Sequence, residues 1–293
     1  MTMISRLVFF KNEKKTPKQS SDRITLNEIS IVIPVKNNQR GIDNYLKAFF
    51  ETQQPEFYPK EIIIVDNNST LPLEVNHLLD RIRLPVHLIQ CRQPGAGAAR
   101  NAGVEQAMGK WVLFNDSDCI PTSSLLTGYL YSDNGSLGYS GNVKSLGSDL
   151  LSRYYESQEI LIPLKVHDVE RGFVPQYLIT ANCLVWRQAF ITTDGFDERI
   201  TIAGGEDIDL GLRLSQLGCL SYAFDSLVLH NFDDGILGFC RRFKRYGTGN
   251  KMVERIWNVR LTPKPFKPNH PTPANWTFAI LQYIYLLAGY IKS

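Results

Sequence analysis

The chain has 293 residues, of which 43% are hydrophobic and 21% are charged, and its formal net charge is +3. This composition is that of a globular protein with one large domain or two small ones, and the charge is too small to indicate a nucleic-acid partner. The five cysteines are scattered and show no Cys-x-x-Cys spacing, which favours reduced thiols in a cytosolic protein over a disulfide framework or a zinc site. They are Cys91, Cys119, Cys183, Cys219 and Cys240.

Residues 1–28 are predicted to form a polar, flexible leader. Their apolar run, Leu7–Phe10, is too short for the hydrophobic region of a signal peptide, and no small-residue cleavage site follows it. No stretch of the chain reaches the ~20 apolar residues that a membrane-spanning helix needs. We expect a main domain over residues 29–235 and a separate tail over residues 236–293.

Apolar strands alternate with amphipathic helices through the first part of the main domain. Expected strands cover residues 29–35, 61–66, 86–89 and 111–114, and expected helices cover residues 44–52, 75–82 and 95–108. This alternation predicts an α/β fold with a Rossmann-like, mostly parallel sheet and helices on both faces. Between residues 120 and 180 the pattern becomes irregular, which indicates strands and loops over a crevice rather than a second Rossmann unit.

Three of the expected strands end in residues suited to ligand binding. Pro34, Asp66 and the Asp116/Asp118 pair all follow apolar runs, and ligands of such sheets bind outside the carboxyl ends of the strands. In extended backbone, residues i and i+2 point the same way. Asp116 and Asp118 would therefore repel each other unless a cation or a ribose-and-phosphate ligand lay between them. Mg²⁺ takes both carboxylate and phosphate oxygens.

Five motifs in order make the chain resemble the family 2 glycosyltransferases, which have the GT-A fold. The motifs are Ser30–Asn37, Ile64–Ser69, Gly97–Gly103, Asp116–Asp118 and Gly204–Leu210. The resemblance covers residues 29 to about 232. It implies an inverting enzyme that uses a divalent cation, Mn²⁺ or Mg²⁺. Such an enzyme would move a sugar from a nucleoside-diphosphate sugar, UDP- or dTDP-linked, to a glycan or lipid-linked acceptor.

The resemblance also assigns residues to the donor. Asp66 would accept a hydrogen bond from the base, and Pro34 and Val35 would supply backbone contacts. The alternative for Asp66 is a turn or helix cap, because Asp-Asn-Asn-Ser suits both. Arg100 would pair bidentately with the diphosphate, with Asn101 beside it in the donor site. The alternative for Arg100 is a surface arginine in a helix.

The metal site would be formed by Asp118, with Asp116 nearer the ribose. His230 follows an apolar strand and is the candidate for a second protein ligand, although most lone histidines are structural. The metal would bridge the two phosphates and neutralise the leaving nucleoside diphosphate.

The acceptor side is expected around the start of a helix at Glu206. Acids in a first helical turn are stabilised by the helix dipole, but this does not explain the preceding Gly204–Gly205 pair. Sugar transfer with inversion needs a carboxylate that takes the proton of the acceptor hydroxyl. By family position Asp207 is that base, Glu206 orients the acceptor, and Asp209 braces the helix.

Two residues about twenty positions before this helix complete the implied acceptor and sugar site. They are Asn182 and Trp186. The alternative for Trp186 is a place in the hydrophobic core.

The tail over residues 236–293 begins with a predicted basic amphipathic helix, continues through a proline-rich linker and ends in an apolar helix over residues 276–290. The basic residues are Arg241, Arg242, Lys244 and Arg245. Such a helix suits a membrane surface or a phosphate-bearing ligand, and a solvated basic face is the alternative. Residues 245–249 resemble bacterial polysaccharide-building transferases. We therefore expect a cytoplasmic enzyme, peripheral on the inner membrane. For the last helix, an interfacial position, a dimer contact and packing on the main domain stay open.

Two other functions compete with this interpretation. A nucleotidyltransferase would share the nucleotide-binding sheet and the metal carboxylates, but it would normally carry a glycine- and lysine-rich phosphate loop where this chain has Pro34–Asn38. A non-catalytic sensor of nucleotide sugars would not need Asp207.

Overall fold

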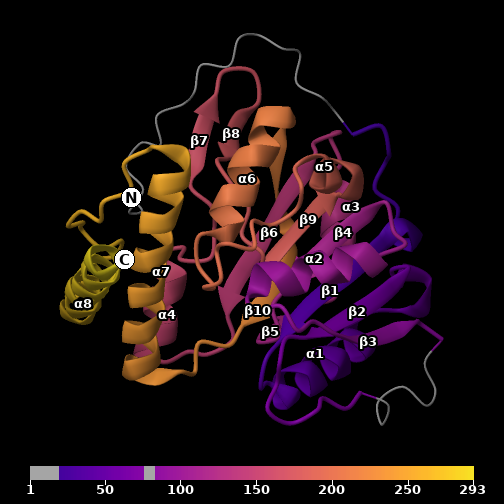
Figure 1. The fold of residues 1–293 in the computed structure, drawn as a ribbon, viewed down its shortest axis with the longest axis horizontal. Coiled ribbons are helices and arrows are strands. Elements are labelled where there is room, and N and C mark those ends of the chain that lie inside the picture. Colours follow the sequence, from indigo (N-terminus) through magenta and orange to yellow (C-terminus); the bar gives the residue numbers. More distant parts are fainter. Residues whose placement is uncertain (1–19, 76–82) are drawn as a thin grey trace.

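The computed structural model describes residues 20–75 and 83–293, and Figure 1 shows their arrangement. Within these ranges an eight-stranded sheet has the order β3-β2-β1-β4-β9-β6-β10-β5, and β7 and β8 form a separate hairpin. The strands are β1 (Ile29–Val35), β2 (Glu61–Asp66), β3 (Val86–Gln90), β4 (Trp111–Asn115), β5 (Cys119–Pro121), β6 (Gly138–Ser145), β7 (Lys165–Asp168), β8 (Gly172–Pro175), β9 (Asn182–Trp186) and β10 (Leu220–His230).

Helices cover both faces of the sheet, as the sequence predicts. They are α1 (Gln39–Thr52), α2 (Ala96–Gln106), α3 (Thr127–Tyr131), α4 (Leu150–Ser157), α5 (Arg187–Thr192), α6 (Glu206–Leu217), α7 (Gly235–Trp257) and α8 (Pro273–Lys292). Short 3₁₀ turns occur at Leu26–Glu28 and Pro55–Phe57. The helix expected over residues 75–82 falls largely outside the described residues.

The sheet is parallel in its first half and mixed in its second. Strands β3, β2, β1 and β4 are mutually parallel, which confirms the predicted strand–helix alternation. Strand β9 then runs antiparallel to both β4 and β6, β10 is parallel to β6, and β5 is antiparallel to β10. This mixed half corresponds to the irregular sequence pattern after residue 120.

The alternation of side chains along β1 explains how two cores form around one sheet. Ile31 and Ile33 pack with Tyr45 and other residues of α1 on one face, whereas Val32 packs with α2 on the other. Successive strand residues point to opposite faces, and both faces are covered. The continuous apolar runs in the parallel strands follow from this double burial.

Residues 20–28, assigned above to a flexible leader, pack against the domain instead. Ile24 is buried in the main core, and its backbone N–H donates to Asp133 at 3.2 Å. Trp111 donates its indole N–H to the carbonyl oxygen of Arg23. Two apolar side chains, Ile24 and the partly buried Leu26, attach the segment to the domain together with these hydrogen bonds. Residues 1–19 lie outside the described part of the chain.

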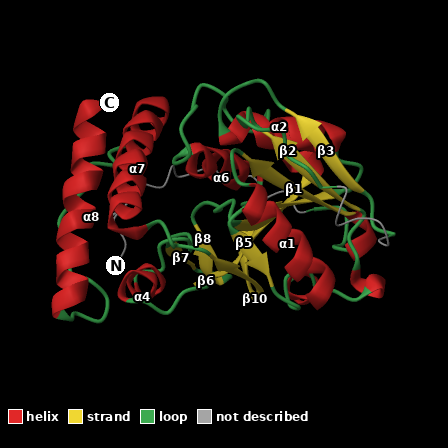
Figure 2. Ribbon diagram, turned by 90° about the horizontal axis from the view of Figure 1, so that it is seen from below, coloured by secondary structure: helices red, strands yellow, loops and turns green. Residues whose placement is uncertain are grey.

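The C-terminal helices α7 and α8 lie side by side and run in the same direction (Figure 2). Phe239 meets Phe278 near their starts, and Arg255 donates to the carbonyl of Ser293 near their ends. Gly247 and Gly289 lie at the helix crossing, where an added Cβ would collide with the backbone of the other helix. The last helix packs on α7 and, through a hydrogen bond from Tyr154 to Gln282, on α4. An interfacial position and a dimer contact for its outer face stay predictions.

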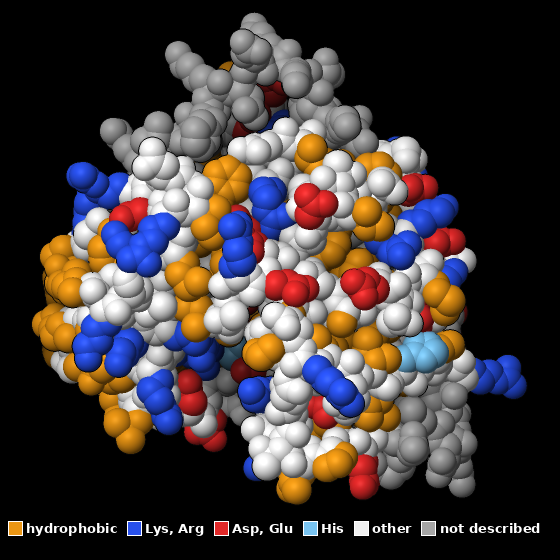
Figure 3. Space-filling view, in the orientation of Figure 1, with side chains coloured by type: hydrophobic (Ala, Val, Ile, Leu, Met, Phe, Trp, Pro, Cys, Tyr) orange, Lys and Arg blue, Asp and Glu red, His pale blue; other side chains and the backbone are white. Residues whose placement is uncertain are grey.

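The outer face of α8 carries an apolar stripe. Its members are Trp276, Ile280, Ile284 and Ile291, which are 43%, 55%, 50% and 71% exposed. Figure 3 shows apolar side chains gathered along the edge of the molecule that α8 occupies. In the described part of the chain, no helix has both the length and the apolar character required to cross a bilayer.

Candidate active site

A polar cavity of about 510 Å³ opens at the carboxyl ends of β1 and β4. Pro34 and Val35 line it from β1, and Asp116 and Asp118 line it from the segment after β4. The opposite wall includes Asp207 at the start of α6. The sequence-based expectation that separate strand ends converge on one crevice therefore describes the geometry correctly.

Asp66 supports this cavity from behind rather than lining it. Its carboxylate accepts hydrogen bonds from the backbone of Ser69 and the side chain of Gln90, both at 2.9 Å. Burial alone would raise the pKa of Asp66, but these hydrogen bonds lower it below its ordinary value. The neighbouring Asn67 lines the cavity and accepts a hydrogen bond from Gly95. Asp66 thus has the turn-forming contacts of the alternative interpretation, and sequence reasoning missed Asn67.

Arg100 is buried between two carboxylates. Its guanidinium lies 2.7 Å from Asp116 and 3.1 Å from Glu206, and it also borders the cavity. Burial would lower the pKa of Arg100, but Asp116 and Glu206 raise it. The alternative of a surface arginine is wrong because Arg100 is buried, and the diphosphate contact stays a prediction. Both prongs of the guanidinium are used internally, so Arg100 holds the end of β4 against the start of α6.

Asn101 turns away from the cavity. Its side chain donates to the carbonyl of Phe196 at 3.0 Å and accepts from the N–H of the same residue at 2.8 Å. It also donates to Glu198. The expected place of Asn101 in the donor site is therefore corrected. It fixes the loop after α5 to α2.

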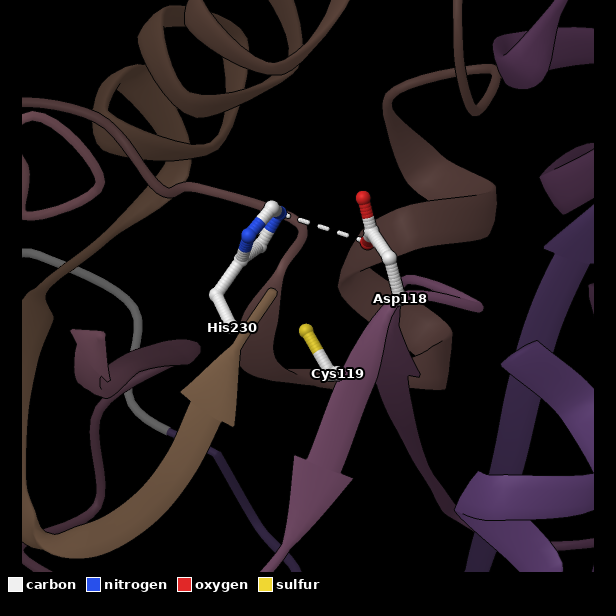
Figure 4. Close-up of side chains that lie close together, drawn as sticks. All are labelled: Asp118, Cys119 and His230. Atoms are coloured by element: carbon white, nitrogen blue, oxygen red, sulfur yellow. Dashed lines mark ion pairs between the residues drawn. The ribbon is translucent and has the colours of Figure 1, made fainter. Parts of the chain in front are cut away.

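Asp118 and His230 point toward each other at the edge of the cavity (Figure 4), and their Oδ1 and Nε2 atoms are 3.3 Å apart. With Cys119 they form a group whose potential ligand atoms all lie within 4.8 Å of one another. His230 is buried and stacks on Phe232, and its Nδ1 has no hydrogen-bond partner among the described residues.

The protonation states fit a divalent cation held by an oxygen and a nitrogen ligand. Burial lowers the pKa of His230 in spite of nearby Asp118, so the imidazole stays neutral, as a metal ligand must. Burial raises the pKa of the Cys119 thiol well above its usual range. The thiol donates to the carbonyl of Ala181. Because a thiol ligates metals as the thiolate, Asp118 and His230 are the better pair.

Asp207 lies at the junction of the polar cavity and the start of α6. The two residues before it, Gly204 and Gly205, have φ angles of 143° and 110°, which side chains with a Cβ rarely adopt. Glu206 turns back to accept from the N–H of Gly204 at 2.6 Å, and Asp209 is paired with Arg213. Of the three acids in this turn, Asp207 and Glu206 line the cavity.

The pKa of Asp207 is raised to about 7, first by burial and then by the adjacent charge of Glu206. A general base works best when its pKa lies near the operating pH. Because only the ionised carboxylate accepts a proton, kcat/KM is expected to fall about tenfold per pH unit below that pKa and to level off above it. A pH–rate profile between pH 5 and 8 at fixed metal concentration checks this. A flat profile across that range would contradict it.

Asn182 and Trp186 are not in the acceptor site, and both expectations are corrected. Asn182 is fully buried, and its amide is satisfied by Tyr129 at 2.8 Å and by the carbonyl of Ser226 at 3.1 Å. Trp186 pairs with Trp111 at the far end of β4. Because β9 runs antiparallel to β4, its last residue lies at the end of the strands opposite the cavity.

The four basic residues of α7 divide into two pairs. Arg242 and Arg245 line the cavity. Arg242 is held by Asp234 at 3.0 Å and lies over the rings of Tyr155 and Phe232. Its Nε is buried without a hydrogen-bond partner among the described residues. Arg241 and Lys244 are exposed on the outside of the helix.

The family can now be assigned by comparison. The family model described as "Glycosyl transferase family 2" matches residues 30–190, which is more than half of the chain. The chain belongs to glycosyl transferase family 2. The matched span contains the strand ends of Pro34, Asp116 and Asp118, and it stops before Asp207 and His230.

One curated relative and two solved structures illustrate the relationship. The pre-mycofactocin glycosyltransferase of Mycobacterium tuberculosis is 27% identical over 229 residues, which cover 75% of this chain and 46% of the relative. This chain therefore spans less than half of that relative.

The solved structures are more distant in sequence. GalNAc-T7 with UDP, GalNAc and Mn²⁺ superposes with a TM-score of 0.57 and 16% identity, over 79% of this chain and 48% of that one. The mannosyltransferase PcManGT from Pyrobaculum calidifontis, in complex with GDP-Man and Mn²⁺, gives a TM-score of 0.56 and 14% identity. The superposition covers 95% of this chain and 77% of that one. These likenesses confirm the predicted GT-A fold.

Proposed function

We propose that this family 2 member moves a sugar from a nucleoside-diphosphate sugar to a hydroxyl group of an acceptor, with inversion at the anomeric carbon. One observation carries the proposal: the Asp118–His230 pair and Asp207 line the same cavity. A metal-ligand pair suited to a diphosphate and a base suited to a hydroxyl thus lie on two sides of one space. Transfer of a sugar from a diphosphate to a hydroxyl requires both groups to be bound in the same space.

The donor would occupy the part of the cavity next to β1 and β4. Pro34, Val35 and Asn67 would contact the nucleoside, with uracil or thymine as the expected base, and Asp116 would lie nearest the ribose. A divalent cation, Mn²⁺ or Mg²⁺, held by Asp118 and His230 would neutralise the charge of the diphosphate. The two solved structures described above hold Mn²⁺ with UDP or with GDP-Man, which supports a divalent cation and a nucleoside-diphosphate donor.

Two arginines would add to the binding of the diphosphate. Arg242 and Arg245 line the cavity, and guanidinium groups bind phosphate oxygens through paired hydrogen bonds. Arg242 is already oriented by Asp234 and by two aromatic rings, so little side-chain entropy would be lost on binding. This assigns to α7 the phosphate contact that the sequence allowed.

Asp207 would act as the general base. As its carboxylate takes the proton of the acceptor hydroxyl, the acceptor oxygen forms a bond to the anomeric carbon. The bond from that carbon to the diphosphate oxygen breaks, and the nucleoside diphosphate leaves with the electron pair. Attack from the side opposite the leaving group inverts the configuration. Glu206, held by Arg100, would keep Asp207 in position rather than contact the acceptor freely.

The acceptor would be a glycan or lipid-linked molecule used for cell-surface polysaccharide or glycolipid synthesis, handled by a cytoplasmic enzyme on the inner membrane surface. The apolar stripe of α8 and the exposed Arg241 and Lys244 on the adjacent α7 support a peripheral membrane contact. Apolar residues beside basic ones are the features of helices that lie in a bilayer interface.

The membrane contact predicts that the chain sediments with anionic liposomes at low salt. Replacing Arg241 and Lys244 together by Gln should weaken partitioning by roughly 30-fold, because each basic side chain near an anionic leaflet is worth about 1 kcal/mol. The matched control replaces Arg40 and Lys47, which are exposed on α1, and should sediment like the parent. If the parent chain stays in the supernatant, a soluble acceptor becomes the better hypothesis.

The proposed activity is tested by screening nucleotide sugars for metal-dependent binding and slow hydrolysis. We expect at least one nucleoside-diphosphate sugar to bind more tightly in the presence of Mn²⁺ than in the presence of a chelator. Absence of metal-dependent binding across UDP-, dTDP- and GDP-linked sugars would contradict the proposal.

A further inference from the structure

A second, smaller cavity of about 130 Å³ adjoins the polar one at Asp207. The two share Asp207 and Tyr246, together with Leu161, Ile179 and Gly204. The base therefore lies at the boundary between a polar space, where the donor would bind, and this second space. Nothing in the donor chemistry described above uses the second space.

The walls of the small cavity are largely apolar and come from distant parts of the chain. Phe243 is contributed by α7, Leu286 by α8, and Ile160 and Ile162 by the loop after α4. Phe243 and Leu286 are almost fully buried. The hydrogen bond from Tyr154 of α4 to Gln282 links α8 to the same region. The C-terminal helix thus completes a wall beside the candidate base.

One amide side chain belongs to this wall. Asn250 of α7 is only 8% exposed and borders the cavity. An amide can both donate and accept hydrogen bonds. Asn250 therefore marks a point where a bound molecule would place a polar atom.

We propose that this cavity binds an apolar group, about the size of one ring, that adjoins the accepting hydroxyl. The inference rests on the proposed sugar transfer and replaces the glycan acceptor considered above by one whose accepting hydroxyl adjoins an apolar group: an aryl, alicyclic or short prenyl alcohol rather than a polyol. An apolar cavity of about 150 Å³ is known to hold benzene, so the space is of the right size. With the apolar group bound there, its hydroxyl lies at Asp207 and Asn250 contacts a polar substituent.

The same walls would discriminate against a polyol. Hydroxyl groups transferred from water into an apolar pocket without partners lose their hydrogen bonds to water. An apolar ring gains from the removal of its surface from water. An apolar acceptor would also exclude water from the space around Asp207, where water would otherwise compete for the sugar.

The test uses the full chain and four small alcohols as probes: phenol, cyclohexanol, 3-methyl-2-buten-1-ol and glycerol. Binding is followed by NMR titration. At least one of the three apolar probes should bind about tenfold or more tightly than glycerol, and the preferred probe distinguishes an aryl, alicyclic or prenyl acceptor. Intermolecular NOEs should connect it to the methyl groups of Ile162 and Leu286, which line the small cavity and not the polar one.

A filling variant tests the location. Ile160→Trp extends a partly exposed side chain into the cavity, and Ile191→Trp makes the same change at an exposed position of α5. We expect the first variant to lose probe binding and the second to keep it. If Ile160→Trp does not fold, the NOEs to Ile162 and Leu286 still decide the question.

Equal binding of glycerol and the apolar probes, or NOEs to residues elsewhere, would overturn this inference. Calorimetry with UDP and Mn²⁺ on the same sample distinguishes a failure of this inference from a failure of the proposed function. Nucleotide binding without binding of any apolar probe would leave the proposed function in place and reject the acceptor class. Probe binding without nucleotide binding would contradict the proposed function and leave the small cavity as an apolar binding site without an acceptor role.

Discussion

Asp207→Asn is expected to lower kcat by about 10²–10⁴-fold, the contribution of a positioned general base, and to leave the affinity for the nucleotide sugar nearly unchanged. The amide keeps the size of the carboxylate but cannot take the proton of the acceptor. In the proposed mechanism the donor binds on the other side of the cavity, where Asp118 and His230 lie. The substitution therefore separates catalysis from binding.

Steady-state kinetics and donor binding on the same preparation check this prediction. The matched control is Asp225→Asn, which removes an exposed carboxylate from β10 and should leave kcat unchanged. A kcat of Asp207→Asn within a few-fold of the parent would contradict the role of base. NMR of the product gives an independent check, because retained anomeric configuration is incompatible with a single displacement assisted by Asp207.

Asp118→Asn is expected to abolish the metal dependence of nucleotide binding while leaving the fold intact. Loss of a direct ligand should weaken metal-dependent binding by about 100-fold or more, because even residues that only orient a ligand are worth about 10–100-fold in metal affinity. The Asp118 side chain is partly exposed at the cavity edge, so its replacement leaves no uncompensated charge in the core.

Calorimetric titration of UDP with and without Mn²⁺ measures this effect. Cys119→Ala is the matched control at the neighbouring position. Its thiol is protonated and bonded to Ala181, so its loss should not change the Mn²⁺ dependence. Unchanged Mn²⁺-dependent binding in Asp118→Asn would refute the assignment, and lost binding in Cys119→Ala would instead make the thiol a ligand.

The parallel half of the fold is predictable from sequence because its strands are continuously apolar and its helices are periodic. The strand ends at Pro34, Asp116 and Asp118 follow from that pattern alone. The helix start at Glu206 is equally clear, because glycines precede the acids. Local sequence predicts these elements, whereas the place of the acids of α6 at the same site was predicted only by the resemblance to family 2.

The wrong predictions concern residues whose positions depend on the direction of a strand or on contacts between distant parts of the chain. Trp186 and Asn182 belong to β9, which runs antiparallel to β4. Trp186 therefore lies at the end of the strands away from the cavity, and Asn182 lies in a buried hydrogen-bond network. The irregular sequence pattern around β9 does not report the direction of that strand. The ion pairs of Arg100 are equally absent from local sequence, because Asp116 and Glu206 are brought to it from 16 and 106 positions away.

The apolar cavity was likewise invisible to sequence reasoning. It depends on α8 packing beside α7, and the sequence left the position of the last helix open. The crossing of these helices is fixed by Gly247 and Gly289, whose importance appears only when the two backbones are seen together. Asn67 was missed because Asp66, its neighbour, carries the more familiar functional group.

The products formed from a nucleoside-diphosphate sugar test the central claim most directly. Incubation of the full chain with the donor identified by screening, Mn²⁺ and an acceptor alcohol should release the nucleoside diphosphate in amounts equal to the glycosylated alcohol. Chromatography of the nucleotide products measures this. Metal-dependent release of nucleoside diphosphate, lost in Asp207→Asn, is the result that sugar transfer predicts. Release of pyrophosphate, or formation of a nucleotide sugar from a sugar phosphate, would contradict it and make the protein a nucleotidyltransferase.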